Sequence, residues 1–187
     1  MEFRRNIWLL FAAGCIGVVS IQLVMPLFPL FLESYGASEM EISFVISLSS
    51  LATTALMIPI SFLMERVGRN WMLLMGFFIW AATPVFMRSA GSWSAVAPLY
   101  MVYNIADAFV GPARMTMIAE YSTPGSQATV FGFMSMDWAL GRIVSPPLSG
   151  FLADRSGWRL SFQVAVIAMA LAVMPVLMLK DEKTAGT

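Results

Sequence analysis

Six long apolar stretches, separated by short polar breaks, limit what this chain can fold into more than any other feature of its sequence. They are Ile7–Leu32, Ile42–Met64, Trp71–Met87, Trp93–Ala119, Val130–Leu152 and Trp158–Leu179. A helix that crosses a bilayer needs about 20 mostly apolar residues, and these stretches lack the period-two alternation of a membrane β-barrel. Charged residues make up only 12% of the chain, against about a quarter in a soluble domain. The sequence therefore predicts an all-α membrane protein with six transmembrane helices.

The distribution of basic residues predicts how these helices are oriented. With six helices, both ends of the chain lie on the same side of the membrane. That side collects Arg4, Arg5, Arg66, Arg69, Lys180 and Lys183, and the opposite side collects Arg88, Arg155 and Arg159. Because Lys and Arg are enriched in cytoplasmic loops, we expect a multi-pass protein of the cell (plasma) membrane with both termini in the cytoplasm, ending in a soluble tail over residues 181–187. The first stretch is longer than the core of a secretory signal, about 7–15 residues, so we expect it to be retained.

Several enzyme classes are excluded by residues that the chain lacks. It contains no histidine, which removes Ser-His catalysis and zinc or haem sites built on histidine. Asp107 and Asp137 lack the Gly-x-Gly-Asp setting of aspartyl intramembrane proteases, and no phosphate-binding loop of the Walker type occurs. Eleven basic and eleven acidic residues balance, so no basic surface for nucleic acid is expected. We expect no enzymatic activity, no metal and no cofactor, and the lipid bilayer as the surrounding partner.

A short polar phrase occurs twice and predicts an internal repeat. SFLMERVGRN, which begins at Ser61, and GFLADRSGWR, which begins at Gly150, are 89 residues apart and agree at several equivalent positions. The chain is therefore predicted to contain two three-helix repeats, over residues 1–90 and 91–180. Because three is odd, the second repeat is inverted in the membrane, an arrangement typical of secondary transporters with a substrate site between the repeats.

The first copy of the phrase resembles a loop of the major facilitator superfamily, whose members have twelve helices in two six-helix halves. The family's loop between its second and third helices reads roughly Gly-x-Leu-Ala-Asp-Arg-x-Gly-Arg-Lys. The matching positions here are Leu63, Arg66, Gly68 and Arg69, with Ser61 and Glu65 in place of the Gly and the Asp. The resemblance implies that the chain is the first six-helix half, and that the Glu65–Arg69 loop gates the outward-facing state. Glu120, at the same membrane face, is the expected partner of Arg66 or Arg69. The other interpretation is a solvated loop that only orients the chain.

A second stretch, GRIVSPPLSG, resembles the family's antiporter motif, roughly Gly-x-x-x-Gly-Pro-x-x-Gly-Gly. The corresponding residues are Gly141, Ser145, Pro146, Ser149 and Gly150. Small residues four apart allow two membrane helices to approach closely, and proline bends a helix. The resemblance favours export by antiport, while ordinary helix packing explains the small residues alone.

Four ionisable residues fall inside the predicted helices: Asp107, Arg114, Asp137 and Arg142. A charge facing lipid at the middle of the membrane costs at least ~2.5–3.5 kcal/mol, so these side chains should face inward, pair or line water. At 1.5 Å per residue, Asp107 and Arg142 lie roughly 15–20 Å from the outer face, where they are expected either to pair structurally or to serve transport. Asp137, expected to have no basic partner at its depth, is the favoured proton carrier, and Arg114 is expected to reach the cytoplasmic surface.

The resemblance also implies that the first and fourth helices line the central cavity, so Gln22, Tyr103 and Asn104 are candidate substrate contacts. The predicted function is a secondary active transporter of small molecules, with proton-coupled efflux. One six-helix half needs a second, so the chain is expected to pair with itself or with a separate half, or to be a truncated product. The alternative is a non-transporting scaffold or regulatory half, which would tolerate neutralisation of both Glu65 and Arg66, whereas a gate would not.

Overall fold

The computed structural model describes residues 5–179, and over that range the chain is helical with no β-strand. Its elements are α1 (Arg5–Val24), a 3₁₀ turn (Met25–Leu27), α2 (Phe28–Ser34), α3 (Glu39–Val67), α4 (Arg69–Met87), α5 (Trp93–Tyr121), α6 (Gln127–Ser156) and α7 (Trp158–Leu177). The predicted all-α class is confirmed, and each predicted apolar stretch corresponds to a helix, with α1 and α2 forming the first. The predicted soluble tail over residues 181–187 lies outside the described residues.

Local sequence explains where several of these helices begin and end. Pro26 lies in the 3₁₀ turn between α1 and α2, where a residue without a backbone N–H interrupts the helical hydrogen bonds. At the start of α3, the Ser38 side chain accepts a hydrogen bond from the Glu41 N–H, and the Glu41 carboxylate accepts one from the Ser38 N–H at 2.8 Å. This reciprocal capping box satisfies two donors that a helix start leaves unpaired.

Two glycines connect consecutive helices as single-residue joints. Gly68 joins α3 to α4 with φ +94°, and Gly157 joins α6 to α7 with φ +69°. Each glycine N–H donates the last hydrogen bond of the preceding helix. Gly68 donates to the Met64 carbonyl at 2.9 Å, and Gly157 donates to the Ala153 carbonyl at 2.8 Å. Only glycine adopts such positive φ values without strain. The two copies of the polar phrase therefore form the same kind of joint.

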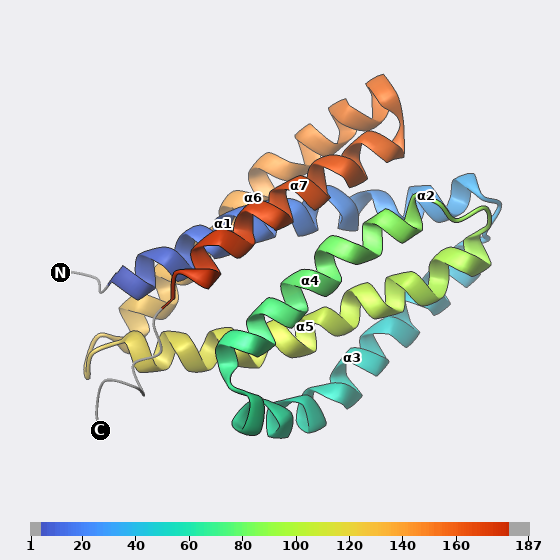
Figure 1. Cartoon of the computed structure of the whole chain (residues 1–187). Helices are drawn as coiled ribbons and strands as arrows, with labels where there is room; N and C mark the ends of the chain where they lie inside the picture. The colour runs from blue at the N-terminus through green and yellow to red at the C-terminus, as the bar shows by residue number, and fades with distance from the viewer. Residues whose placement is uncertain (1–4, 180–187) are drawn as a thin grey trace.

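The helices pack as two groups of three (Figure 1). In one group α1 packs along α6 and α7, and in the other α5 packs along α3 and α4, while contacts between α4 and α7 hold the groups together. Contacts between α5 and α6 are few by comparison. The start of α1, the joint between α3 and α4, the link from α5 to α6 and the end of α7 all lie towards one end of the bundle.

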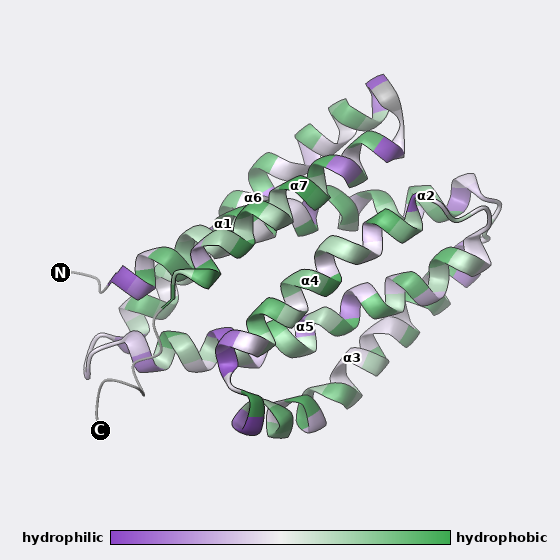
Figure 2. Ribbon diagram, in the orientation of Figure 1, coloured by the Kyte–Doolittle hydropathy of each residue, from purple (hydrophilic) through white to green (hydrophobic). Residues whose placement is uncertain are grey.

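Four helical segments within residues 5–179 are long and apolar enough to cross a membrane: Arg5–Ser34, Glu39–Val67, Arg69–Met87 and Trp158–Leu177. The hydrophilic residues gather mainly near the turns and helix ends, and apolar residues cover most of the helix lengths (Figure 2). Helices α5 and α6, of 29 and 30 residues, are also long enough, but each carries an internal acid and an internal arginine that lower its hydropathy. Four of the six predicted membrane helices therefore have the length and composition of a membrane span, and the crossing of α5 and α6 stays a prediction.

Candidate functional site

A cavity of about 450 Å³ lies among five helices. Its walls include Ile21 from α1, Met57 from α3, Phe77 and Trp80 from α4, Asp107 from α5 and Trp138 from α6. A smaller cavity of about 280 Å³ shares Trp80, Asp107 and Trp138 with it, and Asn104 contributes to the lining of the smaller one. The volume of the larger cavity lies in the range typical of small-molecule sites, about 300–1,000 Å³.

The three residues expected to contact substrate are in different environments. Asn104 lines the smaller cavity and donates from Nδ2 to the Tyr100 carbonyl at 2.9 Å. Tyr103 lies in the packed core, only 1% exposed, and its carbonyl accepts a hydrogen bond from Trp80 Nε1 at 3.0 Å. Gln22 is half-buried, and neither it nor Tyr103 lines either of these two cavities.

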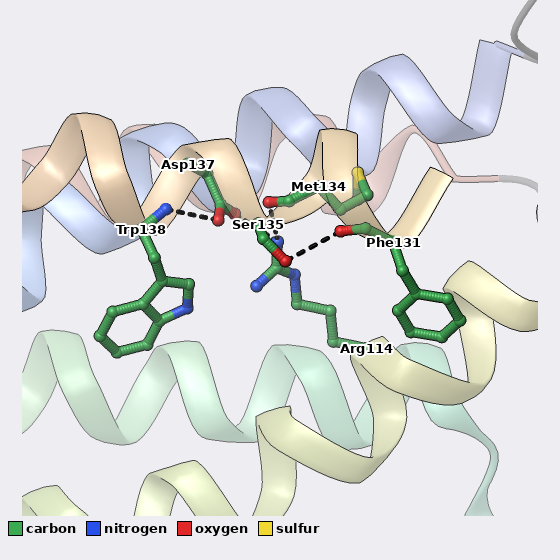
Figure 3. Close-up of polar contacts among 6 residues, drawn as sticks. All are labelled: Arg114, Phe131, Met134, Ser135, Asp137 and Trp138. Carbon is green, nitrogen blue, oxygen red and sulfur yellow. Dashed lines mark hydrogen bonds and ion pairs between the residues drawn. The ribbon is translucent and has the colours of Figure 1, made fainter. Parts of the chain in front are cut away.

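An ion pair between Arg114 of α5 and Asp137 of α6 lies beside the larger cavity (Figure 3). The Arg114 guanidinium also donates to the Met134 carbonyl at 3.1 Å, and Asp137 Oδ1 accepts a hydrogen bond from the Trp138 N–H at 2.6 Å. The Asp137 side chain is 0% exposed, whereas that of Arg114 is 14% exposed and contributes to the cavity wall. Because α5 and α6 otherwise contact each other little, this pair is the main side-chain link between these two helices.

The ion pair corrects two expectations. Asp137 has a basic partner, and Arg114 turns into the bundle towards that partner instead of reaching the cytoplasmic surface. Of the two alternatives for Asp107 and Arg142, the structural pair does not form, and the Arg142 guanidinium lies instead 5.5 Å from the ring centroid of Trp138 on the same helix. Among residues 5–179, Asp107 has no hydrogen-bond or ion-pair partner, so its carboxylate is free within the cavity.

The predicted gating loop forms one ion pair with a neighbouring helix. Arg69, at the start of α4, contacts Glu120, near the end of α5, at 2.5 Å. This is one of the two pairings expected for Glu120. Glu65 and Arg66 are exposed at the end of α3, as is Leu63, and the Ser61 hydroxyl donates to the Met57 carbonyl at 2.7 Å within the helix.

The small residues of the α6 motif form a close seam with α1. A Cβ at Gly141 would clash with the Val18 side chain, and the Ser145 hydroxyl donates to the Val19 carbonyl at 3.4 Å. Ser149 is buried further along the same face, and its carbonyl accepts a hydrogen bond from Ser161 of α7 at 3.4 Å. A Cβ at Gly150 would meet open space, and Pro146 is exposed. The close helix packing expected of this motif therefore involves the face of α6 that carries Gly141, Ser145 and Ser149, and not Pro146 or Gly150.

Sequence reasoning missed the aromatic wall of the cavity and the glycine beneath the ion pair. Trp80, Phe77 and Trp138 lie in the interior of helices, and this interior position is a signal that separates Trp80 and Trp138 from tryptophans at membrane interfaces. A Cβ at Gly14 of α1 would overlap the Asp137 carboxylate. The sequence gives only a weak signal that Gly14 makes room for the Asp137 carboxylate. On a helical wheel of α1, Gly14 and Gly17 lie on one small-residue face, which indicates close packing but not what packs there.

Comparison with known proteins agrees with this architecture. Residues 10–187 match the family model described as the Major Facilitator Superfamily. The chain is 19% identical, over 96% of its length, to an uncharacterised MFS-type transporter, MJ1560, of Methanocaldococcus jannaschii, and covers 47% of that protein. It is 21% identical, over 97% of its length, to the quinolone resistance protein NorA of Staphylococcus aureus (strain MRSA252), and covers 45% of that protein. The chain thus spans about half the length of these curated relatives.

The apolar helices and the family match together identify an integral membrane protein. The match extends over nearly all of the described residues and includes both copies of the polar phrase and the α6 motif. This chain belongs to the Major Facilitator Superfamily.

Proposed function

We propose that this chain is a six-helix half of a secondary active transporter that exports small molecules against proton entry. The observation that carries the proposal is the cavity between the two helix groups, which combines an apolar wall with the free carboxylate of Asp107 and the Arg114–Asp137 pair. Charges at this depth are costly unless they pair or line water, and they commonly mark transport pathways. A scaffold needs no such cavity.

The proposed inverted repeat is consistent with this function. Moving α3 by 89 residues along the chain reproduces the bounds of α6 to within one residue at each end, and moving α4 reproduces those of α7 equally closely. The packing is reciprocal as well, because the first helix of each proposed repeat, 1–90 and 91–180, packs on the last two helices of the other. A site between two such repeats suits alternating access.

Proton coupling is proposed to act through Asp137. When Asp137 takes up a proton, Arg114 loses the charge that holds it, and the main side-chain link between α5 and α6 weakens. Proton binding would thereby be connected to a relative movement of the helix groups. The Arg69–Glu120 pair between α4 and α5 is proposed to act as the cytoplasmic gate, in the plasma membrane with both termini cytoplasmic. A second six-helix half, either another copy or a separate chain, would complete the cavity.

The test is pH-driven uptake of a fluorescent quinolone by inside-out membrane vesicles from cells that express the chain, since such vesicles retain any separate second half. The probe follows from the printed name of the NorA relative. Acidifying the vesicle interior should drive uptake above that of vesicles lacking the chain, and Asp137→Asn should remove this pH-driven increment. Asp154→Asn, the same change at an exposed position of the same helix, is the matched control. Equal pH-driven uptake with and without the chain would refute transport, and undiminished coupling in Asp137→Asn would refute the role of Asp137.

A further inference from the structure

The seam between α4 and α7 carries two cavities of its own. The two helices pack along each other and run in opposite directions (Figure 1). A cavity of about 320 Å³ lies between the end of α4 and the start of α7, and one of about 550 Å³ lies further along the same two helices. Within residues 5–179, no α7 residue lines the 450 Å³ or the 280 Å³ cavity. The α4–α7 seam is therefore a surface separate from the proposed transport site.

The 320 Å³ cavity combines an apolar wall with one cation and one amide. Its apolar wall includes Val85 of α4 and Val166 and Ile167 of α7, and its polar groups are those of Arg88 and Gln163. The Arg88 and Gln163 side chains are exposed and have no hydrogen-bond or ion-pair partner among the residues that the structure describes. A guanidinium and an amide beside each other can both donate hydrogen bonds to one anionic group.

This cavity lies at the boundary between apolar helix and polar turn. Arg88 directly follows the last residue of α4, and α7 begins with Trp158, a residue type enriched where the bilayer meets water. Arg159 adds a second exposed cation one turn before Gln163, on the same face of α7. No acidic residue lines this cavity. Basic side chains at such a boundary attract the phosphate groups of anionic lipids.

The seam beyond Arg88 has the length and character that a lipid chain needs. One leaflet contributes about half of the ~30 Å hydrocarbon core, and about 15 Å corresponds to about ten residues along a helix. Phe78, ten residues before Arg88, lines the 550 Å³ cavity, whose lining contains no charged residue. The two cavities are one helical turn apart, at Ala81 and Pro84 of α4. An extended apolar chain that begins beside Arg88 therefore reaches the 550 Å³ cavity.

We propose that the α4–α7 seam binds one anionic phospholipid. Its phosphate lies between Arg88 and Gln163, and one acyl chain follows the seam from the 320 Å³ to the 550 Å³ cavity. A zwitterionic lipid would bring an ammonium group for which the 320 Å³ cavity has no acid. Because α4 and α7 belong to different helix groups, the bound lipid would contact both groups. The proposal does not depend on the transport function, and in the proposed orientation the lipid lies in the outer leaflet.

Native mass spectrometry tests the proposal by counting lipids bound to the full chain, purified in detergent with any associated partner and stripped of its lipids. The probes are phosphatidylglycerol, which is anionic, and phosphatidylcholine, which is zwitterionic, with identical acyl chains. The wild type should bind phosphatidylglycerol at least about fivefold more tightly, since a basic residue near an anionic lipid contributes about that factor. Arg88→Gln should lower the affinity for phosphatidylglycerol by about fivefold and leave that for phosphatidylcholine unchanged, whereas Arg88→Lys should retain most of the preference.

Two controls separate a lipid site from general attraction between charges. Arg155→Gln removes an exposed arginine at the same end of the bundle, which lies over the Phe151 ring and lines neither cavity of the seam, and it should bind both lipids as the wild type does. Glycerol phosphate, which has the phosphate but no acyl chain, should not displace the lipid. Circular dichroism establishes that each variant is folded.

Three results would overturn the proposal. Equal affinity of the wild type for the two lipids would remove the role of the charges, and equal losses in Arg88→Gln and Arg155→Gln would show that any arginine at this end suffices. Displacement by glycerol phosphate would assign the site to free anions and leave the apolar seam without a role. A copurified membrane protein that prevents lipid binding until it is removed would assign the seam to a partner helix instead.

Discussion

The Arg114–Asp137 pair makes a quantitative and asymmetric prediction about stability. Asp137 is 0% exposed, so Arg114→Met leaves a buried carboxylate without its cation, and breaking a buried pair in this way costs about 3–5 kcal/mol. Asp137→Asn leaves Arg114 at a cavity wall, still 14% exposed and still donating to the Met134 carbonyl. Asparagine also keeps an oxygen that accepts from the Trp138 N–H. We therefore expect this change to cost less, about 1–3 kcal/mol.

The double variant completes a mutant cycle. With both charges removed, no unpaired ion remains, so the loss in Arg114→Met/Asp137→Asn should be smaller than the sum of the two single losses by at least about 1 kcal/mol. The free energy of unfolding is measured by titration with sodium dodecyl sulfate in mixed micelles, followed by far-ultraviolet circular dichroism. Additive losses would show that the two side chains do not stabilise each other. A larger loss of stability in Asp137→Asn than in Arg114→Met would contradict the argument that the buried carboxylate needs its cation more than the arginine needs its anion.

Two further predictions concern glycines and use the same titration. Gly141→Ala should lower the free energy of unfolding by about 1–3 kcal/mol, because its Cβ would clash with the Val18 side chain. A Cβ at Gly150 meets no atom within 4 Å, so Gly150→Ala should leave the stability unchanged or raise it by up to about 1 kcal/mol. Equal losses in both variants would show that the α1–α6 seam is not the cause. Gly68→Ala should cost about 1–3 kcal/mol of stability, because alanine is strained at a φ of +94° even though no atom lies near its Cβ. Gly157→Ala should cost a similar amount at a φ of +69°. Unchanged stability in both variants would mean that the joints adopt other conformations.

Much of the fold was predictable because its determinants are local or periodic. Apolar stretches of sufficient length, broken by glycine and polar turns, predict each helix, and the repeat at an offset of 89 residues predicts that Gly68 and Gly157 occupy equivalent joints. Glu120 was also within reach of sequence reasoning, since Arg69 and Glu120 fall at the same end of adjacent helices.

The charge pairing was not predictable from depth alone. Asp107 and Arg142 do lie at similar depths, each roughly 20 Å along its helix from the link between α5 and α6. Depth, however, says nothing about direction around the helix axis. Asp137 and Gly141 are four residues apart and share the buried face of α6, whereas Arg142, one residue further, is turned by about 100° and is exposed. A helical wheel of α6 would have separated the two ionisable residues.

The cavity walls escaped prediction for a different reason. They combine side chains from five helices that are distant in sequence, and no local pattern states which faces of those helices converge. Only the family resemblance placed α1 and α5 beside a cavity, and it could not identify Trp80, Trp138 or the glycine under the ion pair.

The reciprocal packing of the helix groups also has a consequence for how the protein is made. The partners of α1 are α6 and α7, which begin more than 100 residues after α1 ends. At typical synthesis rates of about 5–20 residues per second, α1 stays in the bilayer without its final neighbours for on the order of ten seconds. During that time the small-residue face containing Gly14 and Gly17 is exposed to lipid and to other newly inserted helices. The final packing of the first helix therefore forms only after the last two helices have emerged from the ribosome.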